Sequence, residues 1–186
     1  MYPLYFAPAG GEGRFDISIA GAGNCSAGAV FCTGDGIAPH SACPCGNASA
    51  AADASGCTNS FGTGGKLRAM GTASISGDTI VLVGTQMTGG AALYFQGTAQ
   101  ANGGNGAALG DGLRCASGTI VRLGQETSVG GASRYPNAGE IPISVRGQLP
   151  PSGGTREYQV WYRNAAAFCT SSTFNWTNGL EIVWLP

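Results

Sequence analysis

Charged side chains are scarce in this chain of 186 residues, where they make up 10%, against about 25% in an average soluble protein. The formal net charge is -1, and no two neighbouring residues carry charge of the same sign. A protein that binds the phosphate backbone of nucleic acid needs a stripe of basic residues on its surface. A protein that binds anionic lipids needs clustered lysine and arginine. We therefore expect no nucleic acid partner and no charged membrane-binding patch.

Long apolar segments are also missing, since no window approaches the roughly 18 consecutive apolar residues of a membrane-spanning helix. The first residues, MYPLYFAPAGGEGR, lack the basic start and the apolar stretch of a signal peptide. We expect no membrane span. If the protein is secreted or displayed on a cell surface, we expect its signal peptide to have been removed already.

Histidine occurs once, as His40, and no Gly-x-Ser-x-Gly motif is present. A Ser-His-acid or Cys-His catalytic site would have to use this residue, which we interpret as an ordinary loop histidine beside Pro39. A glycoside hydrolase needs only two carboxylates, and Glu126, Glu140 and Glu157 leave that exception open. We predict no catalytic residues, no cofactor and no enzyme activity, with glycoside hydrolysis as the exception.

Glycine is abundant instead, at 33 residues, and short segments alternate apolar with polar side chains as half-buried strands do. These segments span residues 14–21, 71–84, 91–98, 118–124, 140–147, 156–164 and 180–185. Within them, 71–84 predicts a hairpin that turns at residues 76–78, and Pro142 places 140–147 at a sheet edge. Residues 99–112 are expected to form a long loop.

This pattern predicts an all-β fold, namely a disulfide-stapled antiparallel β-sandwich, Ig-like or jelly-roll-like, with an extended N-terminal arm. Residues 1–30 are expected to form the arm or an edge strand. The sandwich domain is expected to span residues 31–186, and its first part, 31–60, is a cysteine-rich loop region.

Seven cysteines occur, and five of them lie between residues 25 and 57. A structural zinc site uses two Cys-x(2–4)-Cys pairs, which the single Cys-x-Cys at Cys43 and Cys45 does not supply, so we expect no metal site. Disulfide bonds remain, because apolar burial alone could hardly fix so glycine-rich a segment. On an extended chain Cys43 and Cys45 point to opposite sides, so we expect them to bond different partners.

The predicted disulfides join Cys32 with Cys43, Cys45 with Cys57, and Cys115 with Cys169. Cys25 is then left over, which indicates an intermolecular bond, a free thiol or an error in the pairing. Two Gly-Asp-Gly triplets, at residues 34–36 and 110–112, fit tight turns better than calcium sites, since no cluster of carboxylates accompanies them.

One ordered set of motifs runs from residue 31 to residue 186. It consists of FCTGDG, CPCGN, GC at 56–57, ALYFQGTAQ, GDGLRC, YQVWYRNAAAFCTSSTFNWTNG and the closing VW. In these motifs the chain resembles an uncharacterised domain at the C-terminal ends of secreted and cell-surface proteins of environmental bacteria. The resemblance implies an exported β-domain with no assigned activity and with six shared cysteines. Residues 1–30, including Cys25, lie outside it.

Aromatic side chains give the strongest indication of a binding site. In segment 156–164, Trp161 shares a strand face with Gln159 and Arg163. In segment 91–98, Tyr94 points to the opposite face from its neighbours Leu93 and Phe95. A flat ring flanked by planar hydrogen-bonding groups can stack on a sugar. The other interpretation is that Trp161 covers a hydrophobic strip or packs on a second layer. The tentative ligand-binding residues are Tyr94, Gln159, Trp161 and Arg163.

Two functions remain. The preferred hypothesis is a non-catalytic extracellular structural or interaction module that self-assembles into a surface or filament, its apolar arm adding a strand to another copy. The alternative is a carbohydrate-binding module that uses exposed aromatic side chains. The expected partner is accordingly the protein itself or a surface polysaccharide.

Overall fold

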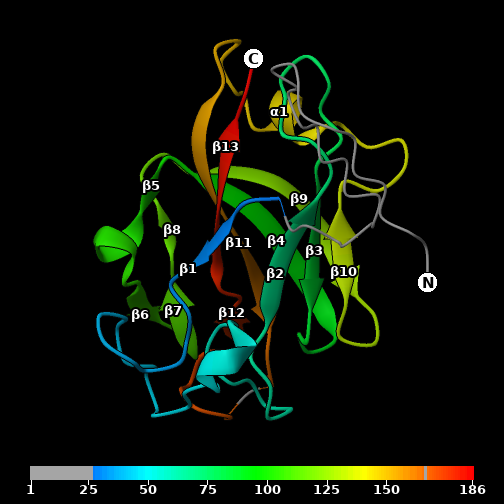
Figure 1. Cartoon of the computed structure of the whole chain (residues 1–186). Helices are drawn as coiled ribbons and strands as arrows, with labels where there is room; N and C mark the ends of the chain where they lie inside the picture. The colour runs from blue at the N-terminus through cyan, green and yellow to red at the C-terminus, as the bar shows by residue number, and fades with distance from the viewer. Residues whose placement is uncertain (1–26, 166) are drawn as a thin grey trace, which may run out of the picture.

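The computed structural model describes residues 27–165 and 167–186, and these form an antiparallel all-β fold, as predicted. The predicted strand at 14–21 and Cys25 lie outside the described residues, as does all of the arm before residue 27. The strands are β1 (Ala29–Phe31), β2 (Lys66–Met70), β3 (Val81–Thr85), β4 (Gly90–Gly97), β5 (Ala99–Gln100), β6 (Ala107–Leu109), β7 (Gly112–Arg114), β8 (Ala116–Ser117), β9 (Val121–Ser128), β10 (Ser133–Tyr135), β11 (Gly154–Arg163), β12 (Phe174–Trp176) and β13 (Gly179–Trp184) (Figure 1). Three short helices accompany them, η1 (Ala51–Asp53), η2 (Ala101–Gly104) and α1 (Ile143–Arg146).

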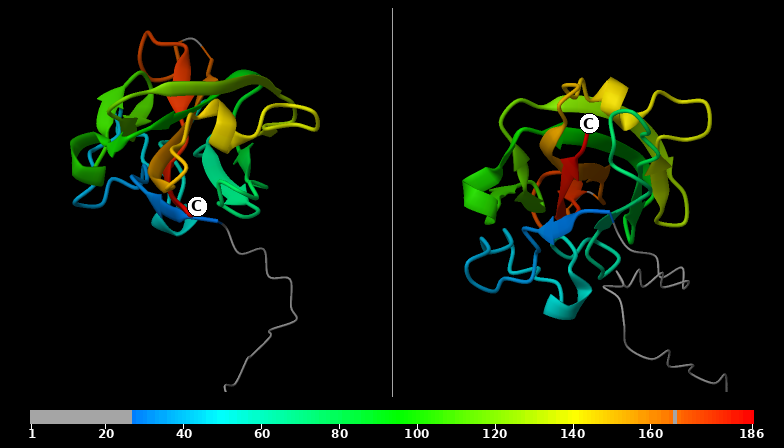
Figure 2. Two further views of the ribbon diagram at one scale, coloured as in Figure 1. Left: turned by 90° about the horizontal axis from the view of Figure 1, so that it is seen from above. Right: turned by 45° about the horizontal axis from the view of Figure 1, so that its top comes forward.

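Two sheets form the two layers of the sandwich (Figure 2). The larger sheet has the order β1-β13-β11-β4-β9, and β12 also pairs with β11, so that β12 and β13 follow one another along the same side of that strand. The smaller sheet has the order β10-β3-β2. Two hairpin-like pairs, β5-β8 and β6-β7, lie outside both layers. None of the helices in the described ranges is long and apolar enough to cross a membrane.

The main core lies between the two sheets. In β11 the alternation predicted from the sequence is confirmed, because Tyr158, Val160 and Tyr162 are all fully buried. Burying a large apolar side chain of this kind contributes roughly 1.5–3 kcal/mol. The same core contains Leu67, Ala69, Leu82 and Tyr135 from the smaller sheet and Ala92, Tyr94, Leu123, Leu180, Ile182 and Trp184 from the larger one.

The edge strand predicted at 140–147 is wrong, because this segment contains the one-turn helix α1. The backbone N–H of Ser144 donates to the Asp78 carboxylate at 2.7 Å, and the N–H of Gly147 donates to the Ile143 carbonyl at 2.7 Å. A carboxylate that accepts from the first turn stabilises a helix start. The apolar residue Ile143 is buried while Val145 is 66% exposed, so the period-2 pattern did not mark a sheet face.

The hairpin predicted over 71–84 is also wrong. Only its second half forms a strand, β3, which pairs with β2, a strand the sequence pattern did not reveal. The first half meets the C-terminal end of the chain instead: the Ile75 N–H donates to the Leu185 carbonyl at 2.8 Å, and the Leu185 N–H donates to the Ala73 carbonyl at 2.9 Å. The predicted loop over 99–112 contains β5, η2 and β6.

Six cysteines form three disulfides, but every predicted pairing is wrong. The bonds join Cys32 with Cys115, Cys43 with Cys57, and Cys45 with Cys169. The expectation that Cys43 and Cys45 bond different partners is confirmed. The predicted disulfides join cysteines that follow one another in sequence, whereas two of the three bonds span 83 and 124 residues.

Asp111 explains how Cys169 reaches the cysteine-rich segment. Its buried carboxylate accepts from the Thr170 N–H at 2.9 Å and from the Thr170 hydroxyl at 2.7 Å. Its backbone carbonyl accepts from the Asn47 side chain at 2.9 Å. Asp111 therefore connects the segment that holds Cys45 with the segment that holds Cys169. The triplet at 110–112 forms the turn between β6 and β7, with Gly110 at a φ of 63°, so the predicted tight turn is confirmed.

An aromatic groove on the larger sheet

The four tentative ligand-binding residues separate onto two faces of the larger sheet. Trp161 is half-buried and Arg163 is exposed, both on the outer face, away from the main core. Tyr94 is wrong as a binding residue, because it pairs with Val160 on the inner face and is fully buried. Its hydroxyl accepts from the Gly84 N–H at 3.1 Å and shares a hydrogen bond with Ser133, and its burial raises its pKa.

Gln159 lies on the outer face but is fully buried, so it is also wrong as a binding residue. Its side-chain oxygen accepts from the backbone N–H groups of Cys115 and Ala116, at 2.8 and 3.3 Å. Its side-chain nitrogen donates to the carbonyls of Leu113 and Thr177, both at 2.8 Å. These four bonds use the whole amide. Gln159 therefore attaches the segment between β7 and β8 to the sheet and has no capacity left for a ligand.

Around Trp161 the strand register builds the floor of a groove. Trp161 stands opposite Leu93 of β4 on one side and opposite Trp176 of β12 on the other, and Leu93 in turn stands opposite Gln125 of β9. These four side chains make a row across four neighbouring strands, because directly opposed residues project to the same face. In the next row Phe95 stands opposite Arg122.

The side walls come from the segments that lie outside the two sheets. Leu109 of β6, Arg114 of β7 and Ile120, just before β9, line the groove above its floor. The indole N–H of Trp176 donates to the Leu109 carbonyl at 2.8 Å, which fastens the β6-β7 pair to the floor. The resulting groove has a volume of about 520 Å³ and is lined by Leu93, Phe95, Leu109, Arg114, Ile120, Arg122, Gln125, Trp161 and Trp176.

Aromatic contacts support the position of Trp161. Its ring centroid lies 5.7 Å from that of Phe174, and Phe174 meets Trp176 edge-on at the same centroid distance. Phe95 contacts Trp176 edge-on at 5.8 Å. The Arg163 guanidinium carbon lies 5.9 Å from the Trp161 ring centroid, within cation–π range. Such a connected set of rings fixes Trp161 in place, so that a ligand would meet an already ordered surface.

The other polar residues considered from the sequence lie elsewhere. His40 is half-buried, and its Nδ1 lies 3.0 Å from both the Asp35 carboxylate and the Thr33 hydroxyl. Burial alone would raise the Asp35 pKa, but hydrogen bonds from His40, the Ile37 N–H and Thr33 outweigh it and lower that pKa. A catalytic relay needs the hydroxyl and the carboxylate on different ring nitrogens. This trio therefore has the geometry of a loop-stabilising network.

The three glutamates that left hydrolysis open do not line the groove. Glu126 and Glu140 both contact Asn137, and Glu126 pairs with Ala92 on the inner face of the larger sheet. Glu157 is buried on the outer face, opposite Glu181 of β13. Burial and, secondarily, the Glu181 charge raise the Glu157 pKa to about 7. Among residues 27–165 and 167–186 there is no group of three or more His, Cys, Asp or Glu side chains placed to hold a metal ion.

The groove combines an ordered aromatic floor with guanidinium and amide groups at its sides. Of the four tentative ligand-binding residues only Trp161 lines the groove, while Arg163 lies against the Trp161 ring without lining it. The other lining residues were not predicted, and the only local signal for any of them was that Leu93 and Phe95 alternate with Tyr94. No protein-family model matches this chain, and no curated protein or solved structure matches it either.

Proposed function

We propose that this domain is a non-catalytic extracellular module that binds carbohydrate in the groove around Trp161. The observation that carries the proposal is the half-exposed Trp161, held in a row with Leu93 and Gln125. A sugar ring has an apolar face that stacks on an aromatic ring, while its hydroxyls take hydrogen bonds from neighbouring polar groups. Gln125 and the arginines of the groove are the groups that would serve its hydroxyls.

The extracellular part of the proposal is supported by the three disulfides. Such bonds form and persist in oxidising compartments and are rare in the cytosol. We propose that the protein is secreted or held at a cell surface, which agrees with the resemblance to domains of exported bacterial proteins. That resemblance remains a prediction.

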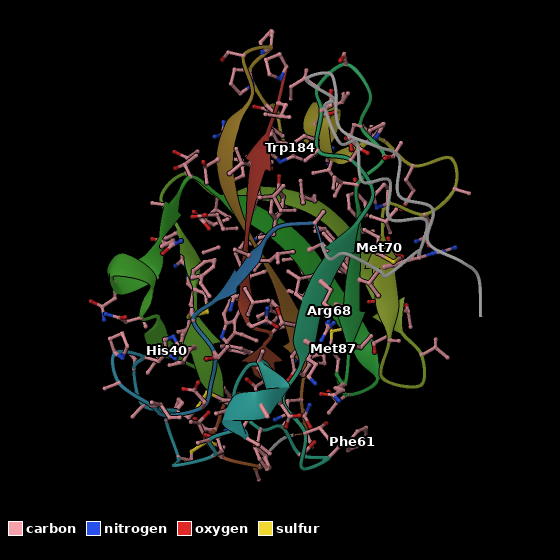
Figure 3. The ribbon with its side chains drawn as sticks, in the orientation of Figure 1. His40, Phe61, Arg68, Met70, Met87 and Trp184 are labelled. Atoms are coloured by element: carbon pink, nitrogen blue, oxygen red, sulfur yellow. A yellow bond between two sulfur atoms is a disulfide. The ribbon has the colours of Figure 1, made fainter. Side chains whose placement is uncertain are left out.

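The test is replacement of Trp161 by alanine, with binding followed by affinity electrophoresis in gels that contain a panel of neutral and acidic polysaccharides. We expect at least a tenfold loss of affinity for the polysaccharides that the unmodified protein binds, because the stacking surface is removed. The matched control is Phe61→Ala. Phe61 is 69% exposed on a loop outside the groove (Figure 3), so binding should not change. Undiminished binding by a folded Trp161→Ala variant would contradict the proposal.

The self-assembly hypothesis keeps one supporting observation. β1 is only three residues long and pairs on one side with β13, at the edge of the larger sheet, with Ala29 and Val30 exposed. An edge strand offers unpaired backbone groups to another chain. The arm that would supply the added strand lies outside the described residues. Deleting residues 1–12 and measuring the mass by sedimentation tests the self-assembly hypothesis. If the arm joins copies by strand exchange, the oligomers formed by the unmodified protein should be absent from the shortened one.

A further inference from the structure

The charge of the groove is strongly one-sided. Arg114 and Arg122 both line it, and none of its lining residues is an aspartate or a glutamate. Within the part of the chain that the structure describes, neither arginine forms an ion pair. Two guanidinium groups in one groove, on a chain with a formal net charge of -1, create a local positive potential that is not a general property of the protein.

The hydrogen bonds of the arginines in and beside the groove show which guanidinium groups are already bound to the protein and which have donors free for a ligand. Arg163 is occupied, since its guanidinium lies against Trp161 and donates to the Thr173 hydroxyl. Arg114 uses only Nε, which donates to the Ala116 carbonyl at 3.1 Å, so its two terminal nitrogens have no protein acceptor within the described residues. Arg122 is exposed on β9, with no side-chain hydrogen bond to the described part of the chain. The groove thus presents free guanidinium donors beside its aromatic floor.

From this arrangement we infer that the groove binds an acidic polysaccharide, with sugar rings stacked at Trp161 and sugar carboxylates held by Arg114 and Arg122. The inference rests on the proposed function and adds the class of ligand. A planar guanidinium matches a carboxylate with two parallel hydrogen bonds, which are stronger than bonds between neutral groups. A neutral sugar would form no ion pair with either guanidinium, and a cationic one would be repelled.

The experiment compares an oligogalacturonate with its methyl ester, a matched pair of probes that differs in the charge of the carboxyl groups. Isothermal titration should give at least tenfold tighter binding of the acid at low salt, and this advantage should shrink as sodium chloride is raised. Arg122→Gln should weaken binding of the acid by about tenfold more than it weakens binding of the ester, because the ester loses only a hydrogen bond to a hydroxyl while the acid also loses a charge pair. Since Arg122 is exposed and makes no side-chain hydrogen bond to the described residues, this variant should fold normally, as a thermal melt would verify.

The matched control is Arg68→Gln, which removes the same charge from the outward side of β2 in the opposite layer (Figure 3). It should leave both affinities unchanged. Equal affinity for the acid and the ester would overturn the acidic ligand class while leaving carbohydrate binding intact. If Arg122→Gln and Arg68→Gln reduced the affinity for the acid equally, the acidic ligand class would also be overturned, because a general effect of net charge would then explain the preference for the acid. Failure of the unmodified protein to bind either probe or any polysaccharide of the panel would overturn the proposed function itself.

Discussion

Replacing Cys32 and Cys115 together by alanine is expected to lower the free energy of unfolding by about 4.5 kcal/mol. The bond spans 83 residues of sequence, and a cross-link over so long a loop removes much of the conformational freedom of the unfolded chain. Both residues are also buried in a small core with Cys43, Cys57 and Leu113, so their removal disturbs packing as well. Urea denaturation of the non-reduced proteins measures the difference.

The other two disulfides provide the controls. The Cys45–Cys169 bond spans 124 residues, and the Cys43–Cys57 bond spans 14. If the bonds act through the unfolded chain, the first double alanine variant should lose about 5 kcal/mol and the second about 3 kcal/mol. A loss below about 1 kcal/mol for the Cys32 and Cys115 variant would contradict the view that covalent links supply much of this domain's stability, which for domains in general is 5–15 kcal/mol.

Replacing Glu157 by glutamine is expected to stabilise the protein above neutral pH by roughly 3 kcal/mol relative to the unmodified chain. Burial and the neighbouring Glu181 raise the Glu157 pKa from its ordinary value of 4.5 to about 7, and one of its carboxylate oxygens is buried without a partner among the described residues. The folded protein therefore holds a proton that the unfolded chain releases. This contribution to stability is complete below pH 4.5 and is lost as the pH rises through 7.

Urea denaturation at pH 5 and pH 8 should show a loss of stability in the unmodified protein that the Glu157→Gln variant lacks. Glutamine is neutral at both values, so the variant keeps an uncharged group opposite Glu181. The control is Glu140→Gln, which changes an exposed carboxyl and should leave the pH dependence between 5 and 8 intact. An identical fall in stability for the unmodified protein and the Glu157→Gln variant would show that Glu157 is not the group responsible.

The sequence was sufficient where a strand alternates strictly. The alternation predicted over 156–164 puts Tyr158, Val160 and Tyr162 on one face, and all three are buried on the inner face of β11, a central strand with neighbours on both sides. At 140–147 the same reasoning failed, since the conformation there depends on the Asp78 carboxylate, which is remote in sequence.

The prediction of disulfide pairing failed for a related reason. The order of the strands in the sheets and contacts such as Asp111 with Thr170 decide which cysteines meet. Neither can be predicted from a local sequence pattern.

The candidate site was only half predictable. Trp161 could be found because it is an aromatic residue on the otherwise polar face of β11. Tyr94 was misplaced because the face of β4 that carries Leu93 and Phe95 was taken for the core face, whereas Tyr94 faces the core and Leu93 and Phe95 line the groove. The burial of Gln159 depends on the segment between β7 and β8 that covers it. Arg114 and Arg122 reach the groove from β7 and β9, which do not pair with β11, and no local sequence pattern predicts that these strands meet beside Trp161.

The most direct test of the central claim is a nitrogen-15 NMR titration with oligogalacturonate that follows the indole N–H signals of the three tryptophans. Trp161 lines the groove, whereas Trp184 lies in the main core, where its indole N–H donates to the Tyr158 hydroxyl at 2.8 Å (Figure 3). We expect the Trp161 signal, assigned by its loss in Trp161→Phe, to shift in a saturable manner while the Trp184 signal stays in place. Saturable binding that leaves the Trp161 signal unmoved would contradict the central claim.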